Sequence, residues 1–115
     1  MGESELLPYL HAGKIIEQYL GVYYHEDFRC LRYVSFGMNK TGYYGLLFEL
    51  FDDSGEGLES IYDYSSVEPD NLSGIEFGPF ESFMNVLDAI RDVVKLDSNK
   101  YLISGQLDEE IIKTN

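Results

Sequence analysis

Apolar residues recur along two segments at spacings that predict helices. Over 3–20 an approximate apolar stripe predicts a first helix that Gly21 ends; its members are Leu6, Leu10, Ile16 and Leu20. Over 79–96 the apolar residues recur every three or four positions and predict a second helix, with Pro79 at its first position. The apolar face of this second helix comprises Phe83, Val86, Leu87, Ile90, Val93 and Val94.

Three segments rich in aromatic and β-branched residues predict strands, at 28–36, 43–51 and 58–65. Short turns that contain glycine, at 37–42 and 52–57, separate these strands and favour an antiparallel meander over parallel pairing. In the second strand, alternation places Tyr44, Leu46, Phe48 and Leu50 on the face opposite Glu49. In the third strand, it places Leu58, Ser60, Tyr62 and Tyr64 toward the core, with Glu59, Ile61 and Asp63 on the opposite face.

The remaining segments add small elements. The stretch 66–78 predicts a loop with a short extended piece at Ile75–Phe77, and 101–104 predicts a last short strand. The tail 108–115 predicts a short helix or a frayed end. The element order therefore predicts one α+β domain over 1–115, in which two helices pack on one face of an antiparallel meander sheet of three to five strands.

Composition places the chain among folded globular proteins, because it is 44% hydrophobic and 25% charged. Its apolar runs are too short for a transmembrane helix, and its N-terminus lacks the basic and apolar regions of a signal peptide. The single cysteine, Cys30, excludes an internal disulfide framework. We therefore expect a cytoplasmic location, where thiols stay reduced.

The net charge of −13 is concentrated in one part of the chain. Residues 41–90 contain eleven acidic residues and no lysine or arginine, whereas 1–40 and 91–115 each contain five acidic and four basic residues. Such concentration costs stability through self-repulsion and indicates a positively charged partner, although a generally acidic cytosolic protein remains an alternative. The negative field argues against direct binding of DNA, RNA or an anionic membrane.

Catalytic residue sets are not apparent in the sequence, so we expect no enzyme activity and no cofactor. Cys30 alternates with Phe28 and Val34 in a predicted strand, which indicates a small buried residue. His11 falls on the first predicted helix, without a base or nucleophile beside it. His25 belongs to the string YYHEDF, but consecutive residues point in different directions and no second histidine or cysteine cluster completes a metal or catalytic site. The glycines match no phosphate-binding loop.

The turn after the second strand has a partial calcium-loop spacing. The matching positions are Asp52, Ser54, Glu56, Gly57, Ser60 and Asp63. Three positions depart from the pattern: Glu56 is long for the fifth, Glu59 occupies the usually apolar eighth, and Asp63 replaces the bidentate glutamate. Predicted strands also flank the loop in place of helices. A hairpin turn without a metal site is the favoured interpretation, and a weak Ca²⁺-binding or small-ligand module remains an alternative.

Carboxylates on the open side of the predicted sheet and its loops are the candidate partner-binding residues: Glu49, Asp52, Asp53, Glu56, Glu59, Asp63, Glu68 and Asp70. Acidic surfaces accelerate and orient the association of proteins with positively charged partners. A nuclease is a natural partner of this kind, because its active-site groove has to attract phosphate. The alternative is a DNA-mimicking antagonist, whose carboxylates would be spaced like the phosphates of DNA.

The segment YLGVYYHEDF, residues 19–28, is similar to the "Y-F-H-Q-D" type segment that follows the first helix in some small immunity proteins. These proteins belong to contact-dependent growth inhibition and related polymorphic toxin systems, and the chain also resembles them in size, acidity and α+β layout. Glu26 stands where that pattern has glutamine. The resemblance implies an inhibitor that neutralises a cognate toxin domain, usually a nuclease, in the cytoplasm of the producing cell. It brings no catalytic residues with it.

Overall fold

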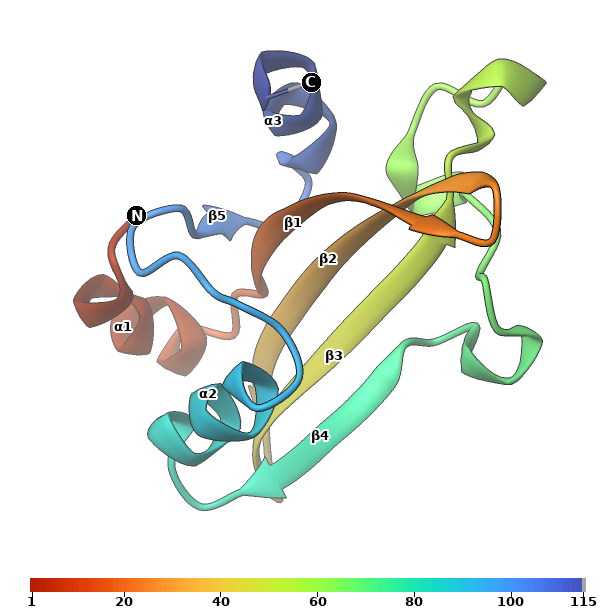
Figure 1. Ribbon diagram of the computed structural model, residues 1–115. Helices are drawn as coiled ribbons and strands as arrows, with labels where there is room; N and C mark the ends of the chain where they lie inside the picture. The colour runs from red at the N-terminus through yellow and green to blue at the C-terminus, as the bar shows by residue number, and fades with distance from the viewer. Residues whose placement is uncertain (115) are drawn as a thin grey trace.

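A five-stranded antiparallel sheet with the strand order β4-β3-β2-β1-β5 forms the centre of the molecule (Figure 1). The computed structural model describes residues 1–114. Its strands are β1 (Ile16–His25), β2 (Phe28–Asn39), β3 (Gly42–Phe51), β4 (Ile75–Phe80) and β5 (Leu102–Ile103). Its helices, α1 (Leu6–His11), α2 (Phe83–Arg91) and α3 (Leu107–Thr114), all pack against strands. The predicted α+β class and antiparallel sheet are confirmed.

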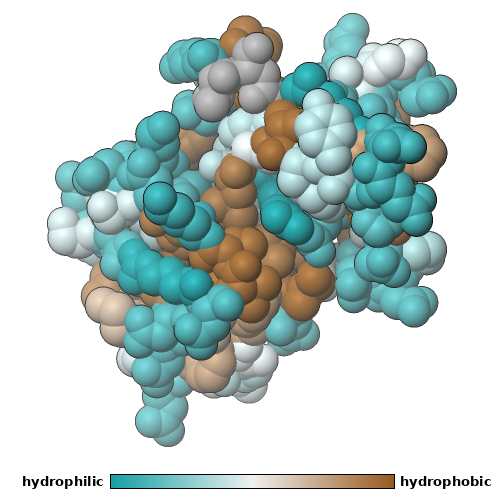
Figure 2. Space-filling model, viewed as in Figure 1, coloured by the Kyte–Doolittle hydropathy of each residue, from teal (hydrophilic) through white to brown (hydrophobic). Residues whose placement is uncertain are grey.

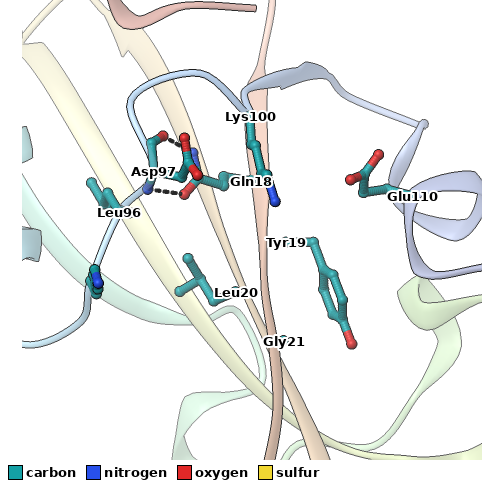
Figure 3. A pocket seen from close by; sticks show the side chains of 9 residues that line it. Gln18, Tyr19, Leu20, Gly21, Leu96, Asp97, Lys100 and Glu110 are labelled. Carbon is teal, nitrogen blue, oxygen red and sulfur yellow. Dashed lines mark hydrogen bonds between the residues drawn. The ribbon is translucent and has the colours of Figure 1, made fainter. Parts of the chain in front are cut away.

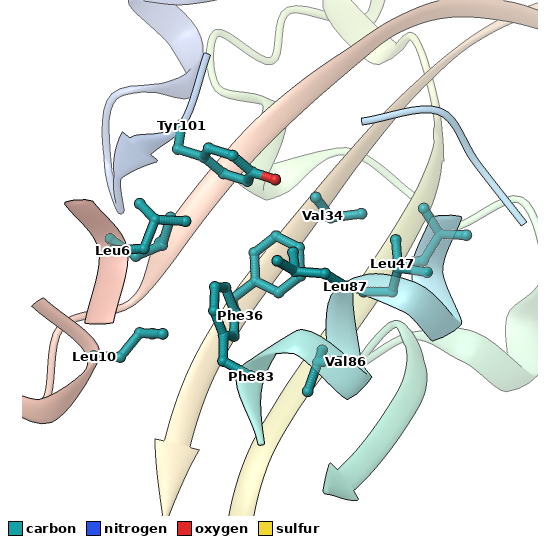
Figure 4. Close-up of a cluster of buried hydrophobic side chains, with 11 residues drawn as sticks. Leu6, Leu10, Val34, Phe36, Leu47, Phe83, Val86, Leu87 and Tyr101 are labelled. Atoms are coloured by element: carbon teal, nitrogen blue, oxygen red, sulfur yellow. The ribbon is translucent and has the colours of Figure 1, made fainter. Parts of the chain in front are cut away.

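The main core lies between one face of the sheet and the helices α1 and α2 (Figure 4). Phe36 of β2 sits at its centre and makes edge-on ring contacts with Phe83 and Tyr101, at centroid distances of 5.6 and 6.0 Å. The α2 side chains predicted for the apolar face are buried from Phe83 to Ile90, because spacings of three and four place them on one side of the helix. The cluster comprises Leu6, Leu10, Ile16, Val34, Phe36, Leu47, Phe83, Val86, Leu87, Ile90 and Tyr101.

A second, smaller core covers part of the opposite face of the sheet. Tyr33 of β2 stacks on Phe48 of β3 with a centroid distance of 4.6 Å. Leu107 of α3 and Ile61 of a 3-10 turn (Ile61–Asp63) pack in the same cluster, where both are fully buried. Residues far apart along the chain therefore meet on this face, and they hold the segment after β3 against the sheet.

The predicted helix over 3–20 is wrong beyond His11. The chain leaves the helix at Gly13, whose φ of +80° is the left-handed conformation that glycine tolerates and other residues avoid. From Ile16 it continues as β1, in which Glu17 pairs with Ser35 and Gln18 with Val34. Gly21 does not end a helix: it lies at φ +99° beside a register shift in this pairing, within the strand.

Two other element predictions are corrected. The segment 58–65 is not a strand: it contains the 3-10 turn Ile61–Asp63, whose first amide groups are bonded by side chains. The second helix begins at Phe83 and not at Pro79, because Pro79 belongs to β4 and the Ser82 hydroxyl caps the helix. This helix ends at Arg91, short of the predicted position 96, and Val93 is 60% exposed.

The other predicted strands are confirmed with adjusted ends. The whole of β3 pairs with β2 from Cys30 to Asn39, and the turn between the two strands consists of the two residues after Asn39. The extended piece predicted at Ile75–Phe77 is the start of β4, and the last predicted strand contains β5. No helix among residues 1–114 is long and apolar enough to span a membrane.

Candidate functional site

An acidic lobe, defined here as residues 52–74, projects beyond the far end of β3 (Figure 1). Seven acidic residues and no lysine or arginine belong to it: Asp52, Asp53, Glu56, Glu59, Asp63, Glu68 and Asp70. Its backbone forms three 3-10 turns, at Asp53–Glu56, Ile61–Asp63 and Pro69–Asn71. In the same view, the surface over the lobe is mostly hydrophilic (Figure 2).

The middle of the lobe returns to the sheet and pairs with the end of β3. Phe51 N–H donates to the Ser65 carbonyl at 2.9 Å, and Val67 N–H donates to the Glu49 carbonyl at 3.0 Å. An isolated antiparallel bridge joins Leu50 and Ser66 between these two bonds. The middle of the lobe is thus hydrogen-bonded to the rigid sheet, and one loop of the lobe precedes this bonded stretch while another follows it.

Three of the predicted contact residues have structural partners. Glu49 lies on β3, outside the lobe, and its Oε2 accepts from Arg32 Nε at 2.7 Å. Asp52 pairs with Arg29 at 3.0 Å and also caps the first 3-10 turn by accepting from the Ser54 N–H. These carboxylates are engaged in holding neighbouring strands and turns, so they are less available to a partner than the sequence predicts.

Asp53, at the start of the first loop of the lobe, is bonded to Ser65 at the end of that loop. Its Oδ2 accepts from the Ser65 N–H at 2.6 Å and from the Ser65 hydroxyl at 2.8 Å. Because Ser65 lies beside β3, this carboxylate fixes the first loop of the lobe on the sheet.

The other five predicted residues are exposed on the lobe, and none forms an ion pair within residues 1–114: Glu56, Glu59, Asp63, Glu68 and Asp70. Their carboxylates are consequently the part of the predicted site that is free to meet a positively charged surface. Arg29, which lies beside the lobe, is already paired with Asp52.

Two carboxylates from segments distant in the sequence hold the lobe in place through hydrogen bonds. Asp108, at the start of α3, accepts from the Ser60 hydroxyl at 2.9 Å and from the Ile61 N–H at 2.8 Å. Glu17 of β1 is 3% exposed and accepts from the Tyr62 hydroxyl at 2.7 Å. These contacts replace the predicted strand at 58–65 with a turn. They bury Ile61, which alternation placed on the outer face, and leave Leu58 and Tyr62 partly exposed.

The Tyr62 hydroxyl is part of a compact polar network. It accepts from the Gly105 N–H at 3.0 Å while donating to Glu17. Burial, and then the hydrogen bond to the Glu17 carboxylate, raise the pKa of Tyr62 to about 12. Burial, followed by the charges of Asp52 and Asp108, raises the pKa of Tyr64 in the same lobe. Both tyrosines therefore stay neutral at physiological pH.

A hollow of about 540 Å³ lies where the lobe meets the β1–β2 hairpin. Phe28 and Phe51 form its apolar wall, with ring centroids 5.7 Å apart and the rings nearly perpendicular. Arg29, Asp52, Asp53 and Glu56 also line it, and Arg29 pairs with Asp52. The sequence placed Phe28 with the buried alternates of Cys30, but it is 59% exposed. The signal that could have located it is its position directly after the turn residues Glu26 and Asp27, at the strand end.

The residues considered for catalysis form no hydrogen bond with one another within residues 1–114. Cys30 is fully buried, as predicted, and its thiol donates to the Phe28 carbonyl at 3.4 Å. A ring nitrogen of His11 lies 2.8 Å from the Tyr43 hydroxyl, near α1. His25 closes the β1–β2 hairpin at the opposite end of β1, paired with Phe28.

The positions of the calcium-like spacing diverge in space. Asp52 turns toward Arg29, whereas the hydroxyl of Ser60 turns toward Asp108. In the part of the chain that the structure describes, no three histidine, cysteine, aspartate or glutamate side chains come close enough to hold a metal ion.

Comparison of the chain with family models, curated proteins and solved structures finds no match.

Proposed function

We propose that this protein is a non-enzymatic inhibitor that binds a basic protein domain through its acidic lobe, and that it acts in the cytoplasm. The proposed partner is a toxin domain with nuclease activity, because a groove that binds nucleic acid carries positive charge. The supporting observation is the set of five exposed carboxylates without ion pairs on one anchored lobe: Glu56, Glu59, Asp63, Glu68 and Asp70.

The anchoring of the lobe supports a role in binding. A flexible acidic loop would lose conformational entropy on binding, which weakens association. Here Asp53 and Asp108 hold the first loop through bonds to Ser65, Ser60 and Ile61. The free carboxylates of the first loop thus sit on a backbone that is held in place, so their charges can act at long range without a large ordering cost.

The hollow beside Phe28 supplies a place for one cationic side chain of the partner. Its aromatic wall and the unpaired carboxylate of Glu56 suit an arginine, whose guanidinium stacks on aromatic faces and pairs with carboxylates. The hollow's own cation, Arg29, is held by Asp52. Such a contact over an aromatic ring contributes about 0.5–1 kcal/mol at an exposed site. We propose that the free carboxylates accelerate association and that this hollow, with Phe28 as its anchor, slows dissociation.

The binding probe of the test is the proposed partner, a basic nuclease domain of a toxin. The lobe variant Glu59→Gln/Asp63→Asn/Asp70→Asn removes three free charges. The control variant Glu5→Gln/Asp88→Asn/Asp92→Asn removes three exposed charges elsewhere. We expect the lobe variant to weaken binding at least about tenfold and the control to change it less than about threefold.

Two results would contradict the proposal. Equal losses in the two variants would mean that only net charge matters, and unchanged binding in the lobe variant would place the interface elsewhere. The DNA-mimicking alternative would be favoured if this protein binds a DNA-binding protein, if free duplex DNA displaces it from that protein, and if it does not bind the toxin domain.

A further inference from the structure

A groove of about 620 Å³ lies between α1 and α2, on the face of the sheet that carries the main core (Figures 1 and 4). Phe83 and Leu87 of α2 line it and are buried, so the groove reaches the edge of the core. Leu7 of α1 and Met84 of α2 line it as well, and both are exposed. A cavity of roughly 300–1,000 Å³ with a mostly apolar lining is typical of small-molecule sites. The groove therefore offers apolar surface from two helices to a ligand.

Two of the three hydroxyl groups that line this groove are already bonded within the protein. The Ser82 hydroxyl caps α2 by accepting from the Asn85 N–H at 3.2 Å. The Tyr43 hydroxyl lies 2.8 Å from a ring nitrogen of His11. The polar selectivity of the groove consequently depends mainly on the carboxylates that line it.

One of the two carboxylates in the groove has no ion-pair partner. Glu3 pairs with Arg91, and it also accepts from the Tyr101 hydroxyl at 3.2 Å. Glu81, directly before the cap of α2, is exposed and forms no ion pair within residues 1–114. Among the described residues that line the groove there is no lysine or arginine. The groove thus carries one uncompensated negative charge.

The electrostatic surroundings of Glu81 also favour a cation. The positive end of α2 lies close to it, because this helix begins at Phe83. A helix end carries only about half an elementary charge, so the full charge of the carboxylate exceeds it. The net charge of −13 acts in the same direction and repels both anionic ligands and a second copy of the chain.

A smaller groove of about 330 Å³ beside β1 shows no such preference (Figure 3). Lys95 and Lys100 line it together with Asp97 and Glu110, so side chains of both charges are present. Its lining therefore selects no ligand charge, in contrast to the groove between α1 and α2.

We propose that the groove between α1 and α2 binds a small ligand in which an apolar body carries one amine group. The apolar body contacts Leu7 and Met84, and the ammonium group pairs with Glu81. Tyr43, which lines the groove, is the second residue of β3, whereas the acidic lobe follows the last residue of that strand. The site is therefore separate from the proposed protein-binding surface.

Three small molecules with a similar apolar body and different head groups test the proposal: 4-phenylbutylamine, 4-phenylbutanol and 4-phenylbutyrate. Near pH 7 the amine is positively charged and the carboxylate negatively charged. Each is titrated, in about 0.15 M salt, into protein labelled at its methionine methyl groups, and NMR follows the Met84 signal, which is identified by its loss in Met84→Leu. We expect a saturable shift with the amine. The amine should bind about threefold tighter than the alcohol and about tenfold tighter than the carboxylate, because an exposed ion pair adds only a few-fold in affinity.

Two pairs of variants separate the charge from the apolar contact. Glu81→Gln should remove the advantage of the amine over the alcohol and leave binding of the alcohol unchanged, which also shows that the variant is folded. The matched control Glu76→Gln changes an exposed carboxylate of β4 outside the groove, and it should keep the advantage of the amine. Leu7→Ala should weaken binding of all three compounds at least about threefold, whereas Leu72→Ala, at an exposed leucine of the lobe, should not.

The proposal is overturned if the amine causes no saturable shift of the Met84 signal up to about 10 mM. It is also overturned if the amine and the alcohol bind equally, or if the advantage of the amine survives in Glu81→Gln. Tighter binding of the carboxylate would make the groove an anion site at the helix ends and would equally contradict it. Because the toxin domain takes no part in these titrations, their result does not bear on the function proposed for the lobe.

Discussion

Tyr62 donates its hydroxyl hydrogen to the buried carboxylate of Glu17, with 2.7 Å between the two oxygens. The bond joins the acidic lobe to β1 across a long stretch of sequence. Replacement of Tyr62 by phenylalanine removes the donor and leaves Glu17 with the Gly105 N–H as its remaining bonded neighbour. We expect Tyr62→Phe to lower the free energy of unfolding by about 1–2 kcal/mol, measured by urea denaturation near neutral pH. An unchanged midpoint would contradict the structural role of the bond.

Alkaline pH should destabilise the protein through the same group. The pKa of Tyr62 is raised from 10.0 to about 12 in the folded protein, by burial and then by the bond to Glu17. Its contribution to stability is therefore complete below pH 10 and is lost as the pH rises through 12. Tyr23, whose pKa is also raised to about 12, acts in the same direction. Urea denaturation across this pH range should show falling stability in the wild type and a shallower fall in Tyr62→Phe. Identical slopes would contradict the assignment.

Asp108 should control how firmly the first loop of the lobe is held. The variant Asp108→Ala removes the acceptor of the Ser60 hydroxyl and of the Ile61 N–H. Loss of these bonds should accelerate hydrogen exchange of the Ile61 amide at least about tenfold, since this amide then opens more easily. The matched control is Glu109→Ala, which changes the next residue of α3, an exposed one. Equal exchange in the two variants would show that Asp108 does not anchor the loop.

Gly45 marks the closest approach of α2 to β3. A Cβ at this position would lie 2.5 Å from Ile90 Cδ1 and 3.0 Å from Val86 Cγ1, so these buried side chains would have to move. Gly45→Ala should destabilise the protein by about 1–3 kcal/mol in thermal or urea unfolding. Gly55→Ala serves as the control, because no atom lies within 4 Å of its Cβ position, and it should be nearly neutral. A neutral result at Gly45 would mean that α2 packs less closely than described.

Phe28 should contribute to partner binding more than to folding. Its ring is 59% exposed and contacts Phe51 at the rim of the acidic hollow. We expect Phe28→Ala to increase the dissociation rate of the toxin domain about tenfold and to change the unfolding midpoint little, because aromatic anchors act mainly on dissociation. The comparison variant is Leu72→Ala, which removes another exposed apolar side chain of the lobe. Dissociation rates that match in the two variants would remove Phe28 from the interface.

The elements that local pattern determines were predicted well. The apolar face of α2 follows from its spacing, and β2 and β3 follow from long runs of aromatic and β-branched residues. The helix expected over 3–20 fails because its apolar stripe also suits a strand once Gly13 breaks the helix. In such a segment, pairing with β2 decides whether the chain forms a strand or a helix, and local spacing of apolar residues does not show this pairing.

The candidate site was predicted in its charge but not in its arrangement. Seven of the eight predicted contact residues lie on the lobe, but the ion pairs of Asp52 and Glu49 with arginines of β2 were not predicted. Likewise, the strand predicted at 58–65 is replaced by a turn because Glu17 and Asp108, distant in sequence, bond to it. Alternation within a segment carries no information about such contacts.

The association rate of the protein with the proposed partner, a basic toxin domain, measured by stopped flow over a series of salt concentrations, tests the central claim most directly. If the exposed carboxylates of the lobe attract a basic partner, the rate should fall about tenfold or more from low salt to about 0.5 M salt. The variant Glu59→Gln/Asp63→Asn/Asp70→Asn should start slower and show a weaker salt dependence. A rate that stays constant with salt, or an equal salt dependence in this variant and the wild type, would contradict the electrostatic role of the lobe.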